Sequence, residues 1–256
     1  MRRTQIKSKK VKYTIEQEER KFKGFSPKTL KFLRGLKANN NKTWFEAHRA
    51  DYQKYVLEPL RNLVIDLGEF MLTIDPHFEI TPAINKTISR IYRDTRFSKD
   101  KSPFRSTVWF TFKNQNKDWA THVSGYFFEL STNSYRYGMG FYNAAPAIMS
   151  KFREMIDENP KEFLKAISFF AKQKTFVLEG AKYKRVFNKT KPKEIQHWYQ
   201  RKNMYVVCNR KIDDTLFSSN LLDDLIYGFN LIAPLYHYLQ KIKTKLSISE
   251  SGRDYG

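Results

Sequence analysis

The sequence is poor in cysteine, in acidic residues and in long apolar runs. Its single cysteine, Cys208, excludes an intramolecular disulfide framework and any metal site built from several cysteines. No apolar run of about 18 residues occurs, and no apolar segment follows Arg2 and Arg3, so the sequence favours neither membrane insertion nor secretion. We therefore expect a cytoplasmic protein with no membrane partner.

The common signatures of enzymes are missing as well. The chain contains no HExxH, GxSxG or GxxxxGK[ST] string, and no GxGxxG after a strand. The sequence therefore does not support a zinc protease, an α/β-hydrolase, a P-loop protein or a dinucleotide-binding protein. The five histidines are scattered and form no local metal-binding pair. We expect no metal and no cofactor, and the sequence singles out no catalytic residue.

Basic residues greatly outnumber acidic ones. The chain has 47 Lys and Arg against 26 Asp and Glu, a formal net charge of +21. This excess favours anionic partners, although a basic solubilising surface gives the same value. Residues 1–23, which hold nine basic and three acidic groups, are predicted to form a disordered arm, and the remainder still carries +15.

The spacing of apolar residues changes twice along the chain. Helical spacing dominates before residue 75 and after residue 146, and β-branched and aromatic segments lie between these regions. The predicted strands are Thr87–Arg93, Thr107–Lys113, Val123–Ser131 and Ser134–Tyr142, with Thr175–Leu178 and Met204–Asn209 as further candidates. This order predicts an α+β fold, with an antiparallel sheet of four or more strands packed against N-terminal and C-terminal helices.

Capping residues and prolines set the predicted helix boundaries. Ser26 and Pro27 begin the first helix, and a capping box of Thr43 and Glu46 begins the second. The last helix is expected over residues 220–242, with an interruption at Pro234. We predict a single domain over residues 24–243 and a frayed tail over residues 244–256.

The densest cluster of charge is the run RIYRDTRFSKDKSPFR, from Arg90 to Arg105. As an extended strand it places Asp94 between Arg90 and Arg96 on one face, since side chains alternate along a strand. A carboxylate there could orient two guanidinium groups whose remaining donors meet a phosphate or a carboxylate. Alternatively, the ion pairs serve only to hold the fold together.

A second basic region covers Lys182–Lys211, with ten Lys or Arg residues and one acidic residue, Glu194. It also contains aromatic residues, and this mixture could stack bases and contact phosphates. A lysine-rich surface loop between core aromatics gives the same string, so both interpretations stay open.

Several strings together resemble a known bacterial family, the domain of unknown function 2461. They are NN at Asn39, WF at Trp44, the arginine-rich run, GYFFELS and YGMGFY, and the resemblance extends from about Phe25 to about Lys241. It implies a shared fold and a shared set of polar residues, and it carries no established activity. It makes a binding role for the arginine-rich run more credible.

We therefore hypothesise a polar pocket for a small phosphorylated or carboxylated ligand. The predicted site residues are Arg90, Arg93, Asp94, Arg96, Lys101, Arg105, Asn39 and Asn40. The two asparagines could donate to an anion near a helix start, or could instead cap helices and form turns. The alternatives are a nucleic-acid-associated protein that does not read sequence, and a non-catalytic interaction protein.

Overall fold

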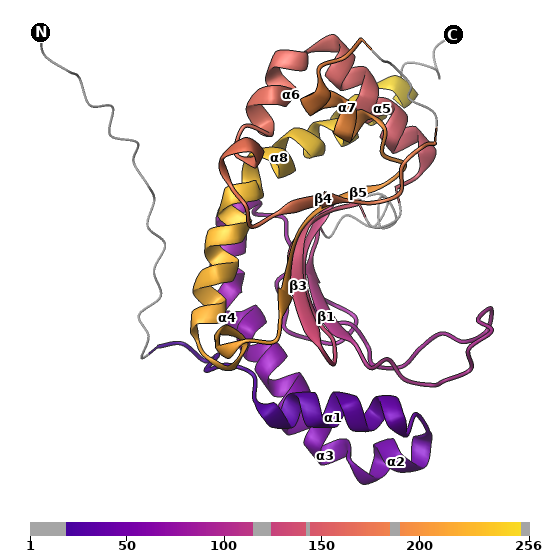
Figure 1. The fold of residues 1–256 in the computed structure, drawn as a ribbon, viewed down its shortest axis with the longest axis vertical. Coiled ribbons are helices and arrows are strands. Elements are labelled where there is room, and N and C mark those ends of the chain that lie inside the picture. Colours follow the sequence, from indigo (N-terminus) through magenta and orange to yellow (C-terminus); the bar gives the residue numbers. More distant parts are fainter. Residues whose placement is uncertain (1–18, 115–123, 142–143, 185–189, 252–256) are drawn as a thin grey trace, which may run out of the picture.

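The computed structural model describes residues 19–114, 124–141, 144–184 and 190–251. Within these ranges five antiparallel strands form one sheet in the order β1-β2-β3-β5-β4 (Figure 1). The strands are β1 (Val108–Phe112), β2 (Gly125–Leu130), β3 (Ser134–Phe141), β4 (Val177–Glu179) and β5 (Met204–Lys211). The predicted α+β fold with an antiparallel sheet is confirmed.

The helices form two groups along the chain. The first comprises α1 (Pro27–Ala38), α2 (Lys42–Ala47), α3 (Arg49–Tyr52) and α4 (Glu58–Ile74), and a π-helical turn over Gln53–Leu57 leads into α4. The second comprises α5 (Pro146–Glu158), α6 (Pro160–Ala166), α7 (Lys193–Tyr199) and α8 (Asn220–Ser251). Figure 1 shows α4 and α8 along one face of the sheet, with α1–α3 at one end of the molecule and α5–α7 at the other.

The two faces of the sheet differ in chemistry because alternate strand residues point to opposite sides. On the face against α4 and α8, which we call the covered face, the strand side chains are buried and largely aromatic. Phe128 stacks on Phe110 at 5.5 Å, and Tyr126 meets Phe229 and Tyr236 of α8 at 5.0 and 5.3 Å between ring centroids. The opposite side, the open face, carries the polar and charged strand residues.

Glycines in β3 bring the central strands unusually close together. A Cβ atom on Gly138 would overlap the backbone carbonyl oxygen of Val206 in β5, and one on Gly140 would overlap that of Met204. Glycine is therefore required where these backbones approach. Because Gly138 pairs with Phe127 and Gly140 with Gly125, these glycines add no side chain of their own to the open face beside β2.

Two predicted helix boundaries are wrong. The second helix is capped by Asn41, whose side-chain oxygen accepts a hydrogen bond from the Trp44 backbone at 2.9 Å, so Thr43 lies inside the helix and forms no cap. Asn41 lies two residues before Thr43, and asparagine is a preferred N-cap residue, so the helix begins directly after Asn41. The last helix continues through Pro234 to Ser251, past its predicted end at residue 242, so the predicted interruption does not occur.

Burial explains why α8 tolerates its proline. Pro234 removes one backbone hydrogen bond, but the neighbouring Ile232, Leu235 and Tyr236 are each at most 1% exposed and hold the helix against the sheet. Residues 252–256 of the predicted tail lie outside the described residues. None of the described helices combines the length and the apolar character needed to cross a membrane.

The folded body already includes part of the predicted arm. Arg20 pairs with both carboxylate oxygens of Asp223 in α8 at 2.8 Å, and Phe22 is fully buried. The Phe22 backbone also donates to Asp66 of α4 at 2.8 Å. These contacts anchor the chain on α4 and α8 before residue 24, and residues 1–18 of the predicted arm lie outside the described residues.

Candidate functional site

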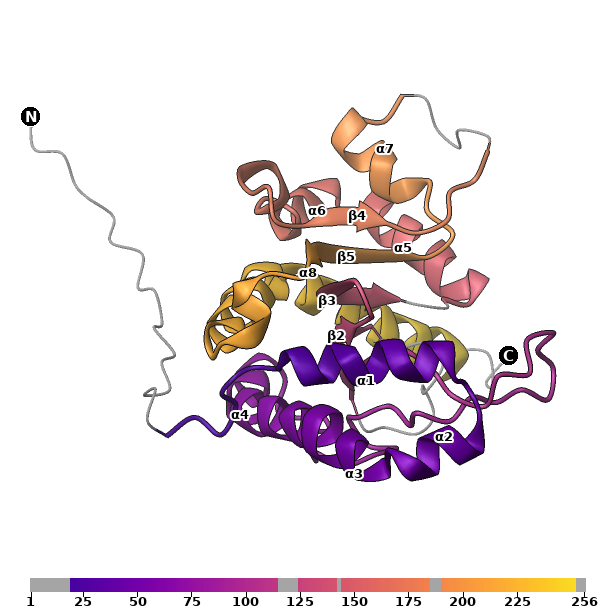
Figure 2. The same cartoon turned by 60° about the horizontal axis from the view of Figure 1, so that its bottom comes forward.

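Residues 90–105, which we call the arginine loop, leave the sheet as two antiparallel segments. Tyr92 forms a bridge with Phe104, and the Arg93 backbone donates to the Pro103 carbonyl at 2.8 Å. Residues 94–101 form the tip beyond this pair. Figure 2 shows the loop, in magenta, projecting past the helices of the body. The predicted cluster is therefore divided between the base of the loop and its tip.

The predicted strand Thr87–Arg93 does not form, and the extended conformation considered up to Arg96 does not persist. This stretch forms isolated bridges, Ile88 with Phe110 of β1 and Tyr92 with Phe104, and the chain turns at residues 96 and 97, which ends the alternation of side chains. Asp94 instead pairs locally with Arg96, accepting from its Nε at 3.0 Å and its Nη2 at 2.7 Å. Within the described structure, Arg90 acts on Asp94 through its charge and makes no hydrogen bond to it.

Short-range polar contacts brace the tip. Asp100 accepts hydrogen bonds from the Ser102 backbone at 2.9 Å and from the Arg93 guanidinium. The Lys101 ammonium donates to the Thr95 carbonyl at 3.0 Å. These contacts cross from one side of the loop to the other, so the tip has a defined shape.

Both carboxylates of the tip are stabilised in their ionised form. Hydrogen bonds from the Arg96 side chain and backbone hold the pKa of Asp94 well below its usual value. Hydrogen bonds from Ser102, and then from Arg93, lower the pKa of Asp100 in the same way. The tip therefore keeps its ion pairs throughout the neutral range.

The two predicted asparagines have different roles. The Asn39 side chain donates to the Gly35 carbonyl at 3.1 Å and caps the end of α1, which is the structural alternative considered for it. Asn40 donates to the Phe104 carbonyl at 2.9 Å and accepts from the Phe104 backbone N–H at 3.0 Å. Asn40 thus pins the arginine loop to the end of α1.

A cavity of 830 Å³, which we call the open-face groove, lies between the base of the arginine loop and the open face of the sheet. Its walls come from the end of α1, the base of the loop and strands β1, β2, β3 and β5. Five basic and two acidic side chains line it. They are Lys37, Arg93, Arg105, Lys113 and Arg136, with Asp100 and Glu129.

The structure divides the predicted site residues into two groups. Asn40, Arg93 and Arg105 line the open-face groove. Asn39 caps α1 outside it. The other four belong to the exposed surface of the arginine loop and do not line the groove: Arg90, Asp94, Arg96 and Lys101.

Arg105 is held in the groove by an aromatic ring. Its guanidinium carbon lies 5.0 Å from the centroid of the Trp109 ring, a cation–π arrangement. Its Nε atom is buried and has no hydrogen-bond partner. Among the described residues, no carboxylate forms an ion pair with Arg105. A buried donor of this kind is costly to leave unsatisfied, and an anionic oxygen would satisfy it.

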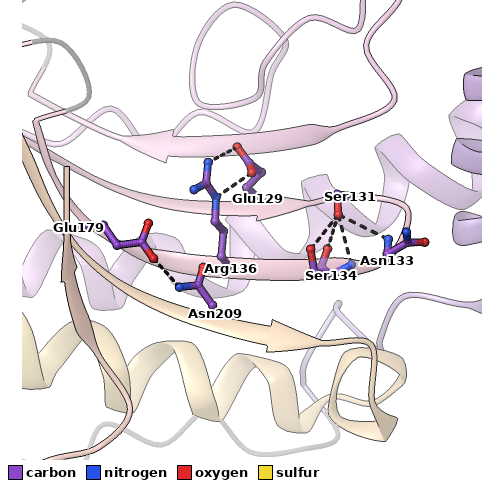
Figure 3. Close-up of polar contacts among 7 residues, drawn as sticks. All are labelled: Glu129, Ser131, Asn133, Ser134, Arg136, Glu179 and Asn209. Carbon is purple, nitrogen blue, oxygen red and sulfur yellow. Dashed lines mark hydrogen bonds and ion pairs between the residues drawn. The ribbon is translucent and has the colours of Figure 1, made fainter. Parts of the chain in front are cut away.

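Arg136 on the floor of the groove has the opposite environment. It donates to both carboxylate oxygens of Glu129, from Nε at 2.7 Å and from Nη2 at 3.2 Å (Figure 3). Its guanidinium carbon also lies 5.9 Å from the Phe127 ring centroid. Farther along the sheet, Asn209 donates to Glu179 at 2.7 Å. Arg136 is therefore neutralised within the protein, whereas Arg105 is not.

Sequence reasoning missed most of the lining residues, among them Lys37, Trp109, Lys113, Glu129 and Arg136. A signal was present in the strand segments, where Glu129 and Arg136 each stand between two buried positions. The register places these two directly opposite each other on β2 and β3. An acid and a base at matched positions of a predicted hairpin could have indicated this pair.

The second basic region, Lys182–Lys211, does not form one continuous surface in its described part. Trp198 is 2% exposed and belongs to the core. Arg201 is buried and donates to the Leu178 carbonyl at 2.7 Å, so it ties α7 to β4. Residues 185–189 of this region lie outside the described ranges. In the parts of the chain that the structure describes, no three His, Cys, Asp or Glu side chains gather as a metal site.

Comparison with known proteins places these features in a family. A family model for a conserved hypothetical protein, DUF2461, matches residues 28–238, from α1 to α8. A search of curated proteins found no match. The matched range contains both the arginine loop and the strands beneath the open-face groove. The chain therefore belongs to the DUF2461 family, as its arginine-rich run and strand motifs predicted.

Proposed function

We propose that the open-face groove binds a small anionic ligand bearing a phosphate or a carboxylate. The observation that carries this proposal is Arg105, a cation on an aromatic ring with a buried, unpartnered Nε. The Trp109 ring fixes the plane of the guanidinium without neutralising it. An oxyanion that approaches in that plane meets preoriented donors, which is the geometry that makes arginine effective for carboxylates and phosphates.

The charge of the groove supports an anion rather than a cation or an apolar ligand. Two of its arginines are already matched by carboxylates, Arg93 by Asp100 and Arg136 by Glu129. Lys37 and Lys113 lie on the rim and are exposed, and they add positive charge to that of Arg105. The groove therefore keeps a net positive charge after its internal ion pairs are formed, which raises the local concentration of anions.

The size and shape of the groove suit a small molecule. Its 830 Å³ lies within the range of about 300–1,000 Å³ that is typical of ligand pockets. Trp109, Phe127 and Tyr205 add aromatic surface. The ligand that fits best combines one anionic group for Arg105 with a less polar body for the aromatic wall.

A thermal-shift screen tests the proposal. Phosphate esters, mononucleotides and small carboxylic acids are added to the protein, and a ligand at 100 times its dissociation constant should add about 2.7 kcal/mol. For a chain of this size we expect an increase in melting temperature of roughly 5–10 °C. Arg105→Ala should weaken binding about 10-fold or more, because it removes charge-assisted hydrogen bonds.

Arg90→Ala is the matched control, because Arg90 lies on the same loop, is exposed and does not line the groove. It should leave the shift unchanged. Equal shifts in wild type and Arg105→Ala, or equal losses in the two variants, would contradict the proposal. The absence of any shift across the three ligand classes would contradict it as well.

A further inference from the structure

The tip of the arginine loop carries an apolar side chain that the groove does not use. Phe97 is 95% exposed, more than any other large apolar side chain in the described ranges. It belongs to the tip of the arginine loop, and Figure 2 shows this loop projecting past the helices. A ring exposed to this extent leaves its faces free to stack on another molecule.

Polar contacts within the tip hold the residues around Phe97 in place. The Arg96 guanidinium carbon lies 5.8 Å from the Phe97 ring centroid, and the Nε and Nη2 atoms of Arg96 donate to Asp94. The bond from Lys101 to Thr95 closes the tip on its other side. Asp94 is thus a positioning residue, since it orients the cation beside the ring.

The surroundings of Phe97 are strongly positive. The run Arg90–Arg105 holds six basic and two acidic residues. Both acids are paired, Asp94 with Arg96 and Asp100 with Arg93. Lys99 is exposed and adjoins the tip without an ion pair to any described residue. The ring is therefore presented on a surface that attracts polyanions.

We propose that the tip of the arginine loop binds single-stranded nucleic acid, with Phe97 stacked on an unpaired base and Lys99 and Arg90 on the phosphates. An aromatic ring interleaved with cations is the arrangement that holds single strands without reading their sequence. The charge of the whole chain, +21, is complementary to such a partner. This site is distinct from the open-face groove.

A membrane surface fits these observations less well. Phe97 is a single ring between Arg96 and Ser98, with both ionised carboxylates of the tip nearby. Insertion would bring these charges into the headgroup region, and stable membrane attachment usually needs a larger apolar face or a lipid anchor. Stacking on a base requires only the exposed face of the ring.

Fluorescence anisotropy with a fluorescein-labelled oligothymidylate tests the site. We expect the intact chain to bind, and Phe97→Ala to weaken binding about 10-fold without changing its salt dependence, because stacking is lost and no phosphate contact is. Lys99→Ala should instead reduce the slope of log affinity against log salt by about 0.7. Tyr227→Ala is the control, since Tyr227 is 66% exposed but lies on α8, and it should bind as wild type does.

Phe97→Trp distinguishes a nucleic acid from a lipid surface. Relative to the parent protein, the added tryptophan emission should be quenched by the oligothymidylate and unchanged by vesicles of phosphatidylcholine and phosphatidylserine. A blue shift with vesicles, together with no response to the oligonucleotide, would overturn the proposal in favour of a membrane. Equal oligonucleotide binding by wild type and Phe97→Ala, or no binding by the intact chain, would also overturn it.

Discussion

The covered and open faces of the sheet are built from the same five strands and have opposite chemistry. On the covered face Phe128 stacks on Phe110, and Tyr126 packs against Phe229 of α8. On the open face their immediate neighbours Phe127, Glu129 and Trp109 line a polar groove. The comparison indicates that the covered face supplies the stability of the fold, which leaves the open face able to carry unsatisfied charge.

The arginines sharpen this comparison. Arg136 and Arg93 are matched by carboxylates of the protein, and such pairs can serve the fold alone. Among the residues that the structure describes, no carboxylate pairs with Arg105, whose guanidinium lies over the Trp109 ring. A cation that the protein orients without neutralising is a better indicator of a binding site than the local density of charge, which is highest at the exposed tip of the arginine loop.

The largest expected effect separates two adjacent phenylalanines of β2. Phe128→Ala removes a fully buried ring from the covered face and should lower the free energy of unfolding by about 3–5 kcal/mol. Phe127→Ala, on the half-buried open face, should cost about 1.5 kcal/mol. Urea unfolding followed by circular dichroism measures both. Equal losses would show that the two faces contribute alike to stability.

Two glycines provide the next test. Gly138→Ala places a Cβ atom against the Val206 carbonyl in β5 and should destabilise the protein by about 3 kcal/mol. Gly68→Ala is the control, because the nearest atom outside its own helix, in Ile80, would lie 3.6 Å from the new Cβ atom. In helix α4 that change should stabilise the protein by up to about 1 kcal/mol. A tolerated Gly138→Ala would contradict the close approach of β3 and β5.

A smaller effect concerns Asp75, a carboxylate that contacts the aromatic cluster beneath the covered face. Burial raises the pKa of Asp75, but hydrogen bonds from Tyr236 and His77 outweigh burial and hold that pKa below its usual value. Tyr236→Phe should therefore lower the free energy of unfolding by about 2 kcal/mol at neutral pH.

The sign of the pH dependence follows from the lowered pKa of Asp75. Stability gained from a depressed pKa is present above the unfolded value, near 3.8, and is lost as pH falls through the folded value. The difference between wild type and Tyr236→Phe should therefore be largest at neutral pH and shrink below about pH 4. Thermal unfolding across the acidic range measures it, and a difference that grows on acidification would contradict the assignment.

Much of the fold could be predicted from local sequence. Alternation over GYFFEL and SYRYGMGF marked the two strands that form the centre of the site, and Pro146 and Pro160 marked helix starts. The order of the strands could not be predicted, because β5 inserts between β3 and β4 through contacts distant in sequence. The helix interruption predicted at Pro234 was wrong, because the tertiary burial of its neighbours overrides the local cost of a proline.

The site was predicted only in part, for a physical reason. Charge density drew attention to Arg90, Asp94 and Arg96, where a turn replaces the expected strand. Arg105 stood at the end of the same run, but its significance comes from stacking on Trp109, and this depends on how the loop folds back onto β1. No pattern of spacing distinguishes a paired arginine from one that lacks a carboxylate partner.

The most direct test of the account observes the Arg105 guanidinium itself. In a nitrogen-15 NMR spectrum of the arginine Nε–H groups, assigned with Arg105→Lys, the protein is titrated with the anion that gives the largest thermal shift. We predict that the Arg105 signal moves and becomes protected from exchange with water, while the signal of Arg136, bound to Glu129, moves little. A stationary Arg105 signal during saturable binding of that anion would contradict the claim that this residue makes the open face an anion-binding site.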